Sequence, residues 1–157
     1  MLKSRRKFIK NILSISTYGL TIASGFLHSA WANILWQKES FSPRTYEGTL
    51  SHLFKDVEFI DSKKIKFKRL PRVAENGAVV PITITSTLEN IDKISILVEK
   101  NPHPLIAEFY LSAAVEPIIS ARLKMAETSN VIAIIEAEGK YYRNSRKVVV
   151  AVGGCGG

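Results

Sequence analysis

The chain has 157 residues, of which 46% are hydrophobic and 23% are charged, and its formal net charge is +8. This length suits one compact domain with a single core, and the sequence contains no internal repeat. One cysteine and three scattered histidines lack the spacing of metal ligands, so neither a metal site nor another cofactor is predicted.

The first 32 residues have the layout of a removable export signal. Arg5 and Arg6 form a pair within residues 4–10, a mildly apolar stretch covers residues 12–27, and Ala30-Trp31-Ala32 supplies a small-x-small cleavage site. The apolar stretch is shorter than the ~20 residues of a membrane span, so no stable membrane insertion is predicted. An ordinary secretory signal is the alternative, but the arginine pair favours twin-arginine export to the periplasm.

Removal of this signal changes the charge of the protein. Residues 1–32 hold five cations and no acid, so cleavage lowers the formal net charge from +8 by five, to +3. The remaining basic cluster covers residues 63–69, where Ile65 and Phe67 alternate with lysines. This alternation indicates the solvated face of a strand, so a nucleic-acid partner is not predicted.

Residues 33–152 are predicted to form one domain that begins with little regular structure. Residues 33–45 read as a loose lead-in. Residues 46–56 favour a short helix, because Leu50, Leu53, Phe54 and Val57 form one apolar stripe.

The rest of the domain reads as β-structure. Beta-branched residues and apolar alternation recur in short runs, separated by turn signals at residues 75–77, 101–104 and 138–139. Seven short strands with regular turns predict an all-β, immunoglobulin-like sandwich. The predicted strands are Ile65–Leu70, Val79–Thr85, Lys93–Glu99, Ile106–Leu111, Ile118–Met125, Val131–Ala137 and Tyr142–Val152.

The chain ends in Gly153-Gly154-Cys155-Gly156-Gly157, which places the only cysteine between two glycine pairs. These five residues predict a flexible C-terminal arm that presents a thiol beyond the last strand. His52 and His103 could not be held in register with a thiol on such an arm, so no catalytic Cys–His pair is predicted. A carrier thiol, an intermolecular disulfide and an incidental cysteine all remain open from the tail alone.

Four segments of the chain resemble the SoxY family, the sulfur-carrier subunit of the thiosulfate-oxidising Sox system. They are the terminal pentapeptide 153–157 and residues 75–81, 101–107 and 125–131, in the family's order and behind a twin-arginine signal. The resemblance spans about residues 71–157, and residues 33–70 carry little of it.

The resemblance implies a specific function. SoxY proteins have an immunoglobulin-like fold, pair with SoxZ as a heterodimer and are not enzymes. Cys155 would be conjugated to thiosulfate by a c-type haem enzyme. A manganese-dependent hydrolase would then release sulfate, and a further Sox enzyme would oxidise the remaining sulfane sulfur. Gly153, Gly154, Gly156 and Gly157 would form the carrier arm. The competing function is an exported structural or adhesion module that dimerises through a disulfide at Cys155.

Overall fold

The computed structural model describes residues 38–42, 45–55 and 57–154. This part of the chain contains a short 3-10 helix, one α-helix and nine strands. The helices are η1 (Lys38–Phe41) and α2 (Tyr46–Phe54). The strands are β1 (Phe59–Asp61), β2 (Ile65–Lys68), β3 (Val73–Asn76), β4 (Val80–Ser86), β5 (Ile91–Val98), β6 (Leu105–Tyr110), β7 (Ile118–Leu123), β8 (Ser129–Ala137) and β9 (Lys140–Val152).

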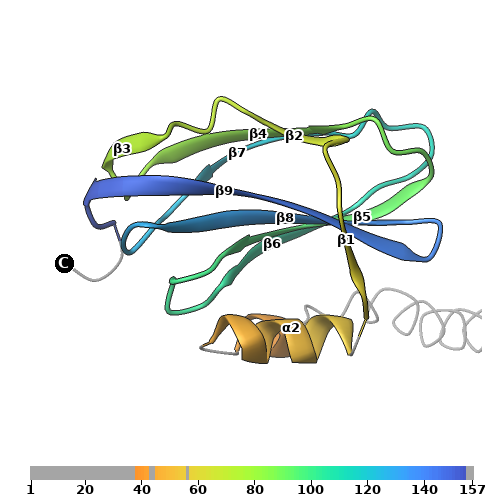
Figure 1. Ribbon diagram of the computed structural model, residues 1–157, viewed down its shortest axis with the longest axis horizontal. Coiled ribbons are helices and arrows are strands. Elements are labelled where there is room, and N and C mark those ends of the chain that lie inside the picture. Colours follow the sequence, from red (N-terminus) through yellow and green to blue (C-terminus); the bar gives the residue numbers. More distant parts are fainter. Residues whose placement is uncertain (1–37, 43–44, 56, 155–157) are drawn as a thin grey trace, which may run out of the picture. The chain divides into compact units, whose positions relative to one another are not determined.

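The strands form two sheets that face each other (Figure 1). The larger sheet has the order β1-β9-β8-β5-β6, and β3 also pairs with β9 beyond β1. The smaller sheet has the order β2-β4-β7. All pairs within these orders are antiparallel except those of β1 and β3, which both run parallel to β9. The architecture is therefore a β-sandwich, and its largest strand, β9, is bordered by three others.

The main core fills the space between the two sheets. Strand alternation places one set of side chains inside, and in β2 this set is Ile65 and Phe67 while Lys66 and Lys68 face solvent. The isoleucines of β4 and β5 supply much of the remaining core, together with Val131, Ala133 and Ile135 of β8. This outcome confirms that the basic cluster is the outer face of a strand.

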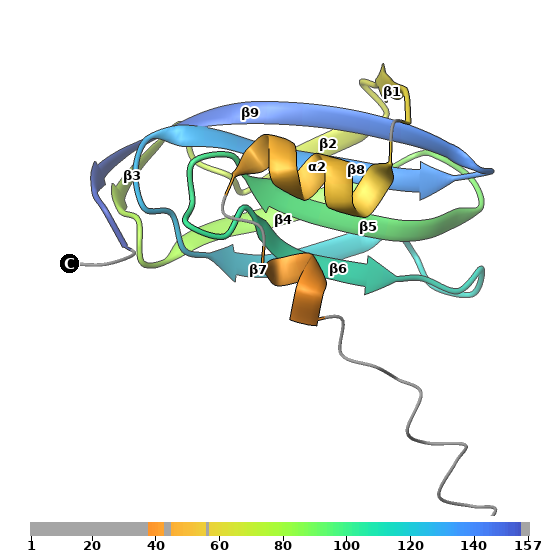
Figure 2. The same ribbon diagram turned by 90° about the horizontal axis from the view of Figure 1, so that it is seen from below.

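α2 lies over the outer face of the large sheet (Figure 2), and a second core fills the space between the helix and this face. β5 and β8 are buried on both faces, and their outward side chains Leu97, Ile132 and Ile134 pack against Phe54 of the helix. The Thr45 hydroxyl caps the helix by accepting a hydrogen bond from the Gly48 amide at 3.1 Å. The predicted apolar stripe of the helix is confirmed, since Leu50, Leu53 and Val57 border this core.

The all-β sandwich and all seven predicted strands are confirmed, with boundaries that differ by a few residues. The sequence analysis missed β1 and β3. It also treated residues 33–45 as a loose lead-in, whereas η1 forms within them and Phe41 packs against the second core. Within residues 38–154 as described, no helix is long and apolar enough to cross a membrane. Arg5 and Arg6 of the predicted signal lie outside the described residues.

Candidate functional site

The candidate site is the end of the sandwich where β9 stops. β9 is 13 residues long, and its last pairing joins Val152 to Asn76 of β3. Gly153 and Gly154 continue the chain beyond the strand. Cys155, Gly156 and Gly157, which the sequence analysis assigned to the thiol-bearing arm, lie outside the described residues. The structure therefore describes the base from which the cysteine extends.

Three segments are joined at this base by a series of backbone hydrogen bonds. The Gly77 amide donates to the Val152 carbonyl at 2.7 Å, and the Met125 amide donates to the Gly77 carbonyl at 2.7 Å. The Gly154 amide then donates to the Met125 carbonyl at 2.8 Å. We call Gly77, Met125 and Gly154 the terminal junction. It ties the residue before Cys155 to two loops that are distant in sequence.

Glycine is required at this junction because the backbones approach closely. A Cβ atom on Gly154 would lie 2.0 Å from the Ala78 nitrogen, and one on Gly77 would lie 2.3 Å from the Met125 oxygen. A Cβ atom on Gly153 would meet the Ala126 oxygen at 2.3 Å. No real side chain tolerates such distances to backbone atoms. Gly153 and Gly154, which were predicted as the compliant start of the arm, therefore pack against the domain.

A buried asparagine holds the second loop of the junction. The Asn101 side chain, 6% exposed, donates from Nδ2 to the Lys124 carbonyl at 2.7 Å. Its Oδ1 atom accepts a hydrogen bond from the Ala126 amide at 2.9 Å. These two bonds bracket Met125, whose side chain is fully buried. Asn101 thus fixes the carbonyl that receives the Gly154 amide.

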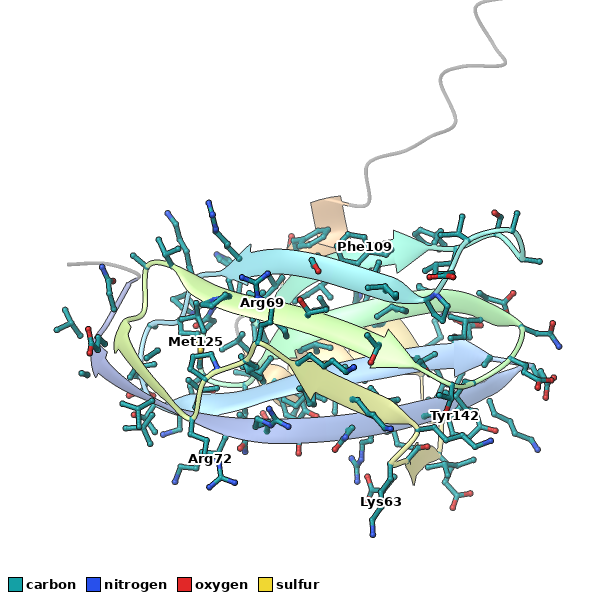
Figure 3. All side chains as sticks on the ribbon, turned by 90° about the horizontal axis from the view of Figure 1, so that it is seen from above. Lys63, Arg69, Arg72, Phe109, Met125 and Tyr142 are labelled. Carbon is teal, nitrogen blue, oxygen red and sulfur yellow. The ribbon has the colours of Figure 1, made fainter. Side chains whose placement is uncertain are left out.

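Side-chain oxygens also shape the other segments around the junction. The Asn76 Oδ1 atom accepts from the Ala78 amide at 2.8 Å, forming an Asx turn next to Gly77. The Thr128 hydroxyl accepts from the Val150 amide at 3.0 Å, close to the end of β9. Figure 3 shows Met125 at the same end of the sandwich as the tip of β9. The two loops that approach Gly154, around Gly77 and after Met125, are thereby held by side-chain hydrogen bonds.

The junction unites the segments that the sequence analysis singled out separately. Gly77 belongs to residues 75–81, Asn101 to residues 101–107 and Met125 to residues 125–131, and all three meet at the start of the terminal pentapeptide. The sequence analysis named none of them as site residues. Their presence in the shared segments was the only sequence signal, because their role depends on contacts between distant parts of the chain.

Four exposed valines belong to the segments that lead to the junction. Val152 is 64% exposed and Val79 is 56% exposed, and each lies two positions from a junction glycine in sequence. Val73 and Val149 are partners in the parallel pairing of β3 and β9, and both are also exposed. Exposed apolar side chains of this kind are available for contact with another protein surface.

The described residues supply little chemistry of their own at this end. No group of three or more histidine, cysteine, aspartate or glutamate side chains in the described ranges could hold a metal ion. His52 lies in α2 and His103 in the turn after Asn101, and neither forms part of the terminal junction. What the arrangement does is position the backbone that leads to the cysteine.

Comparison with known proteins gives two informative matches. Residues 50–155 match the family model described as sulfur oxidation protein SoxY. The solved structure of the sulfur carrier protein SoxY from Chlorobium limicola f thiosulfatophilum is 33% identical, covers 68% of this chain and 96% of its own, and gives a TM-score of 0.61.

A second solved structure is more distant. The superoxide reductase (neelaredoxin) from Ignicoccus hospitalis is 13% identical, covers 55% of this chain and 79% of its own, and gives a TM-score of 0.49. At that level it carries no argument about this protein. Among curated protein sequences, none matches the chain.

Proposed function

Because the chain belongs to the SoxY family, whose members carry sulfur and are not enzymes, we propose that it bears thiosulfate-derived sulfur covalently on Cys155. Cys155 is the only thiol in the sequence, and the match to the family model runs to this residue. The observation that carries the proposal is the terminal junction, which anchors Gly154, the residue bonded to Cys155.

The proposed chemistry balances as two steps that other enzymes perform. In the first, Cys155 Sγ loses its proton and forms a bond to the terminal sulfur of thiosulfate, and two electrons pass to a c-type haem enzyme. In the second, water cleaves the bond between that sulfur and the sulfonate group. Sulfate and two protons leave, and one sulfane sulfur stays on Cys155. The manganese-dependent hydrolase that the family implies would perform this second step.

The terminal junction contributes to this role through geometry. It sets the residue before Cys155 at a fixed place at the end of the sandwich, and side chains larger than hydrogen are excluded there. A fixed exit point gives each partner enzyme the same surface to dock on before it reaches the sulfur. Productive encounters depend on such placement, because a misplacement of about 1 Å can cost a factor of about 100 in rate.

We propose that the protein acts in the periplasm as a heterodimer with a SoxZ-type subunit. The support for export is the sequence motif at residues 4–10, and the support for the partner is the family itself. Twin-arginine export carries folded proteins, so a partner without a signal could travel with this chain. Replacement of Arg5 and Arg6 by lysine should leave both subunits inside the cell, and continued export of the partner would contradict the proposal.

Mass spectrometry tests the attachment site directly. The protein is isolated without reductant from cells grown on thiosulfate, and its intact mass and C-terminal peptides are measured. We expect a thiosulfate or sulfane adduct confined to Cys155, which is lost in Cys155→Ser while the melting temperature stays unchanged. A bare thiol, or a covalent homodimer as the main species, would refute sulfur carriage at this residue and favour a structural disulfide.

A further inference from the structure

The outer face of the small sheet is rich in cations and lacks acids. Its outward positions alternate with the buried core positions along β2, β4 and β7. None of these outward residues is acidic, and two cations continue the face just beyond the strands, Arg69 after β2 and Lys124 after β7. The outward residues are Lys66, Lys68, Pro81, Thr83, Thr85, Ile118, Ser120 and Arg122.

Part of this face is hollowed. A surface hollow of about 480 Å³ is lined by two arginines, Arg69 and Arg122, and by the hydroxyl residues Thr83 and Ser120, among others. Thr83 and Ser120 are cross-strand partners, and their hydroxyl oxygens lie 2.9 Å apart in a hydrogen bond. One of the two hydroxyls donates to the other, so the pair retains a free donor that can point into the hollow.

Both guanidinium groups lack a partner within the part of the chain that the structure describes. Among the described residues, neither Arg69 nor Arg122 takes part in a hydrogen bond, ion pair or ring contact through its side chain. Other arginines of the domain differ. Arg143 pairs with Asp61 at 2.7 Å, and Arg146 lies over the Phe67 ring and donates to the Leu70 carbonyl. Two arginines that have no partner among the described residues therefore line one hollow whose lining contains no carboxylate.

The backbone at Arg69 is also unusual. Arg69 has a φ of 56°, in the left-handed region that residues other than glycine rarely adopt. Such a conformation is maintained only when the surroundings determine it, and here Leu70, the next residue, is buried. In Figure 3 the Arg69 side chain lies over β4, on the outer face of the small sheet. The strained turn thus directs this guanidinium across the sheet, toward the hollow.

We propose that this hollow is a noncovalent binding site for a small tetrahedral oxyanion of the sulfate or thiosulfate type. Guanidinium groups bind such anions through paired, charge-assisted hydrogen bonds, and a hydroxyl donor supplies a further contact. The site shares no residue with the terminal junction or with Cys155. It therefore gives the domain an anion-binding function that is independent of covalent sulfur attachment.

A titration monitored by nuclear magnetic resonance tests the site. The Cys155→Ser chain is used, so that covalent loading cannot contribute, and failure of the site leaves the proposal for Cys155 untouched. Sodium thiosulfate, sulfate and phosphate are each added at constant ionic strength, with chloride as the reference anion. We expect saturable shifts of the amides of Arg69, Thr83, Ser120 and Arg122 with the divalent anions, and the comparison ranks the three anions.

Two charge-matched variants separate a built site from general attraction to a basic face. Arg122→Gln should weaken binding about tenfold or more, because it removes one charge-assisted pair of hydrogen bonds. Lys66→Gln removes the same charge from the same face outside the hollow, and it should change the affinity less than about twofold. Equal weakening by both variants, shifts that do not saturate, or shifts scattered over the domain would each overturn the proposal.

Discussion

The core beneath α2 and the terminal junction are stabilised by different kinds of contact. Beneath α2, the stabilising contacts come from large side chains: Phe54 packs edge-on against Phe59 and Tyr141, with ring centroids 5.4 and 5.5 Å apart. At the junction, the contacts are backbone hydrogen bonds between segments with no room for a Cβ atom. The first region should be sensitive to the loss of atoms and the second to their addition.

This contrast has a functional meaning. Side-chain packing beneath α2 involves none of the junction residues. Backbone packing at the terminal junction leaves no side chain at Gly153 and Gly154. In the proposed carrier role, this would keep the approach to Cys155 narrow. Under the proposed carrier role, stability and presentation thus depend on different regions, the face of the large sheet beneath α2 and the end of the sandwich where β9 stops, and substitutions can test each separately.

The largest effect on stability is expected from Phe54→Ala. Phe54 is 3% exposed and joins α2 to the outer face of the large sheet, so truncation leaves a cavity between them. We expect the free energy of unfolding to fall by about 4 kcal/mol in a denaturant titration. Sulfur loading per folded molecule should remain unchanged, and a specific loss of loading would break the separation between the two regions.

Gly77→Ala is expected to impair sulfur loading more than stability. The added methyl group would meet the Met125 carbonyl oxygen, so the junction must open, at a cost of about 2 kcal/mol. Thiosulfate loading of Cys155 should slow by about tenfold or more in a mass-spectrometric time course, since the exit point moves.

Gly139→Ala is the matched control for this substitution. Gly139 has a φ of 69° in the turn between β8 and β9, but a Cβ atom there would meet nothing within 4 Å. Gly139→Ala should lower the free energy of unfolding only by the strain of this backbone conformation, about 1 kcal/mol. Sulfur loading should remain normal. If both glycine variants loaded sulfur at the same rate, the junction would have no role in presentation.

Removal of the Asn101 side chain should sharpen the comparison further. Asn101→Ala leaves the Lys124 carbonyl and the Ala126 amide without their partner, and we expect a loss of about 1–2 kcal/mol by thermal or chemical unfolding. Lys100→Ala, which removes only the exposed ion pair with Glu127, should cost less than about 0.5 kcal/mol. Comparable losses from the two neighbours would show that Asn101 does not support the junction.

A loss of stability is also expected at alkaline pH, and it should arise beneath α2. Burial lowers the pKa of Lys93, but attraction to Glu108, a hydrogen bond with Glu108 and the nearby Tyr110 and Glu136 outweigh it, so the pKa is raised above 10.5. Because the folded protein holds this proton more tightly than the unfolded chain, the resulting stability is complete below pH 10.5 and is lost as the pH rises through the folded pKa.

Burial and Glu136 also raise the pKa of Tyr141, which acts in the same direction above its ordinary value of 10.0. Lys93→Met isolates the lysine contribution. It should reduce the free energy of unfolding at neutral pH by about 1–2 kcal/mol, because it leaves the mostly buried Glu108 without its cation. It should also flatten the decline in stability above pH 10.5. An equally steep decline in the variant would assign the alkaline loss to the tyrosine.

Much of the fold could be read from the sequence, and the reasons are local. The alternation of Ile82 and Ile84 with threonines, and of Ile65 and Phe67 with lysines, follows directly from a strand with one buried face. β1 and β3 were missed because they are three and four residues long and pair in parallel with β9, far away in sequence. Val73-Ala74-Glu75-Asn76 contains no strand pattern of its own.

The residues of the candidate site also fall into those that the sequence could indicate and those that it could not. Cys155 could be singled out because a lone thiol between glycines has few chemical uses, and its assignment stays a prediction. Gly77, Asn101 and Met125 could not, because their contribution is a set of backbone contacts that exist only in the folded chain. The glycines before the cysteine were interpreted as freedom of movement, whereas the close approach to Ala78 and Ala126 shows a packing requirement.

The pairing of β9 also bears on the order in which the domain assembles. β9 borders β1 and β3 from the first half of the described chain, and the Arg143–Asp61 contact between β9 and β1 spans 82 residues of sequence. Contacts between residues so far apart in sequence form late and slowly, because the intervening chain must first be closed into a loop. The Gly154–Met125 bond joins a residue beyond the end of β9 to a distant loop, so it should be among the last contacts that the domain forms.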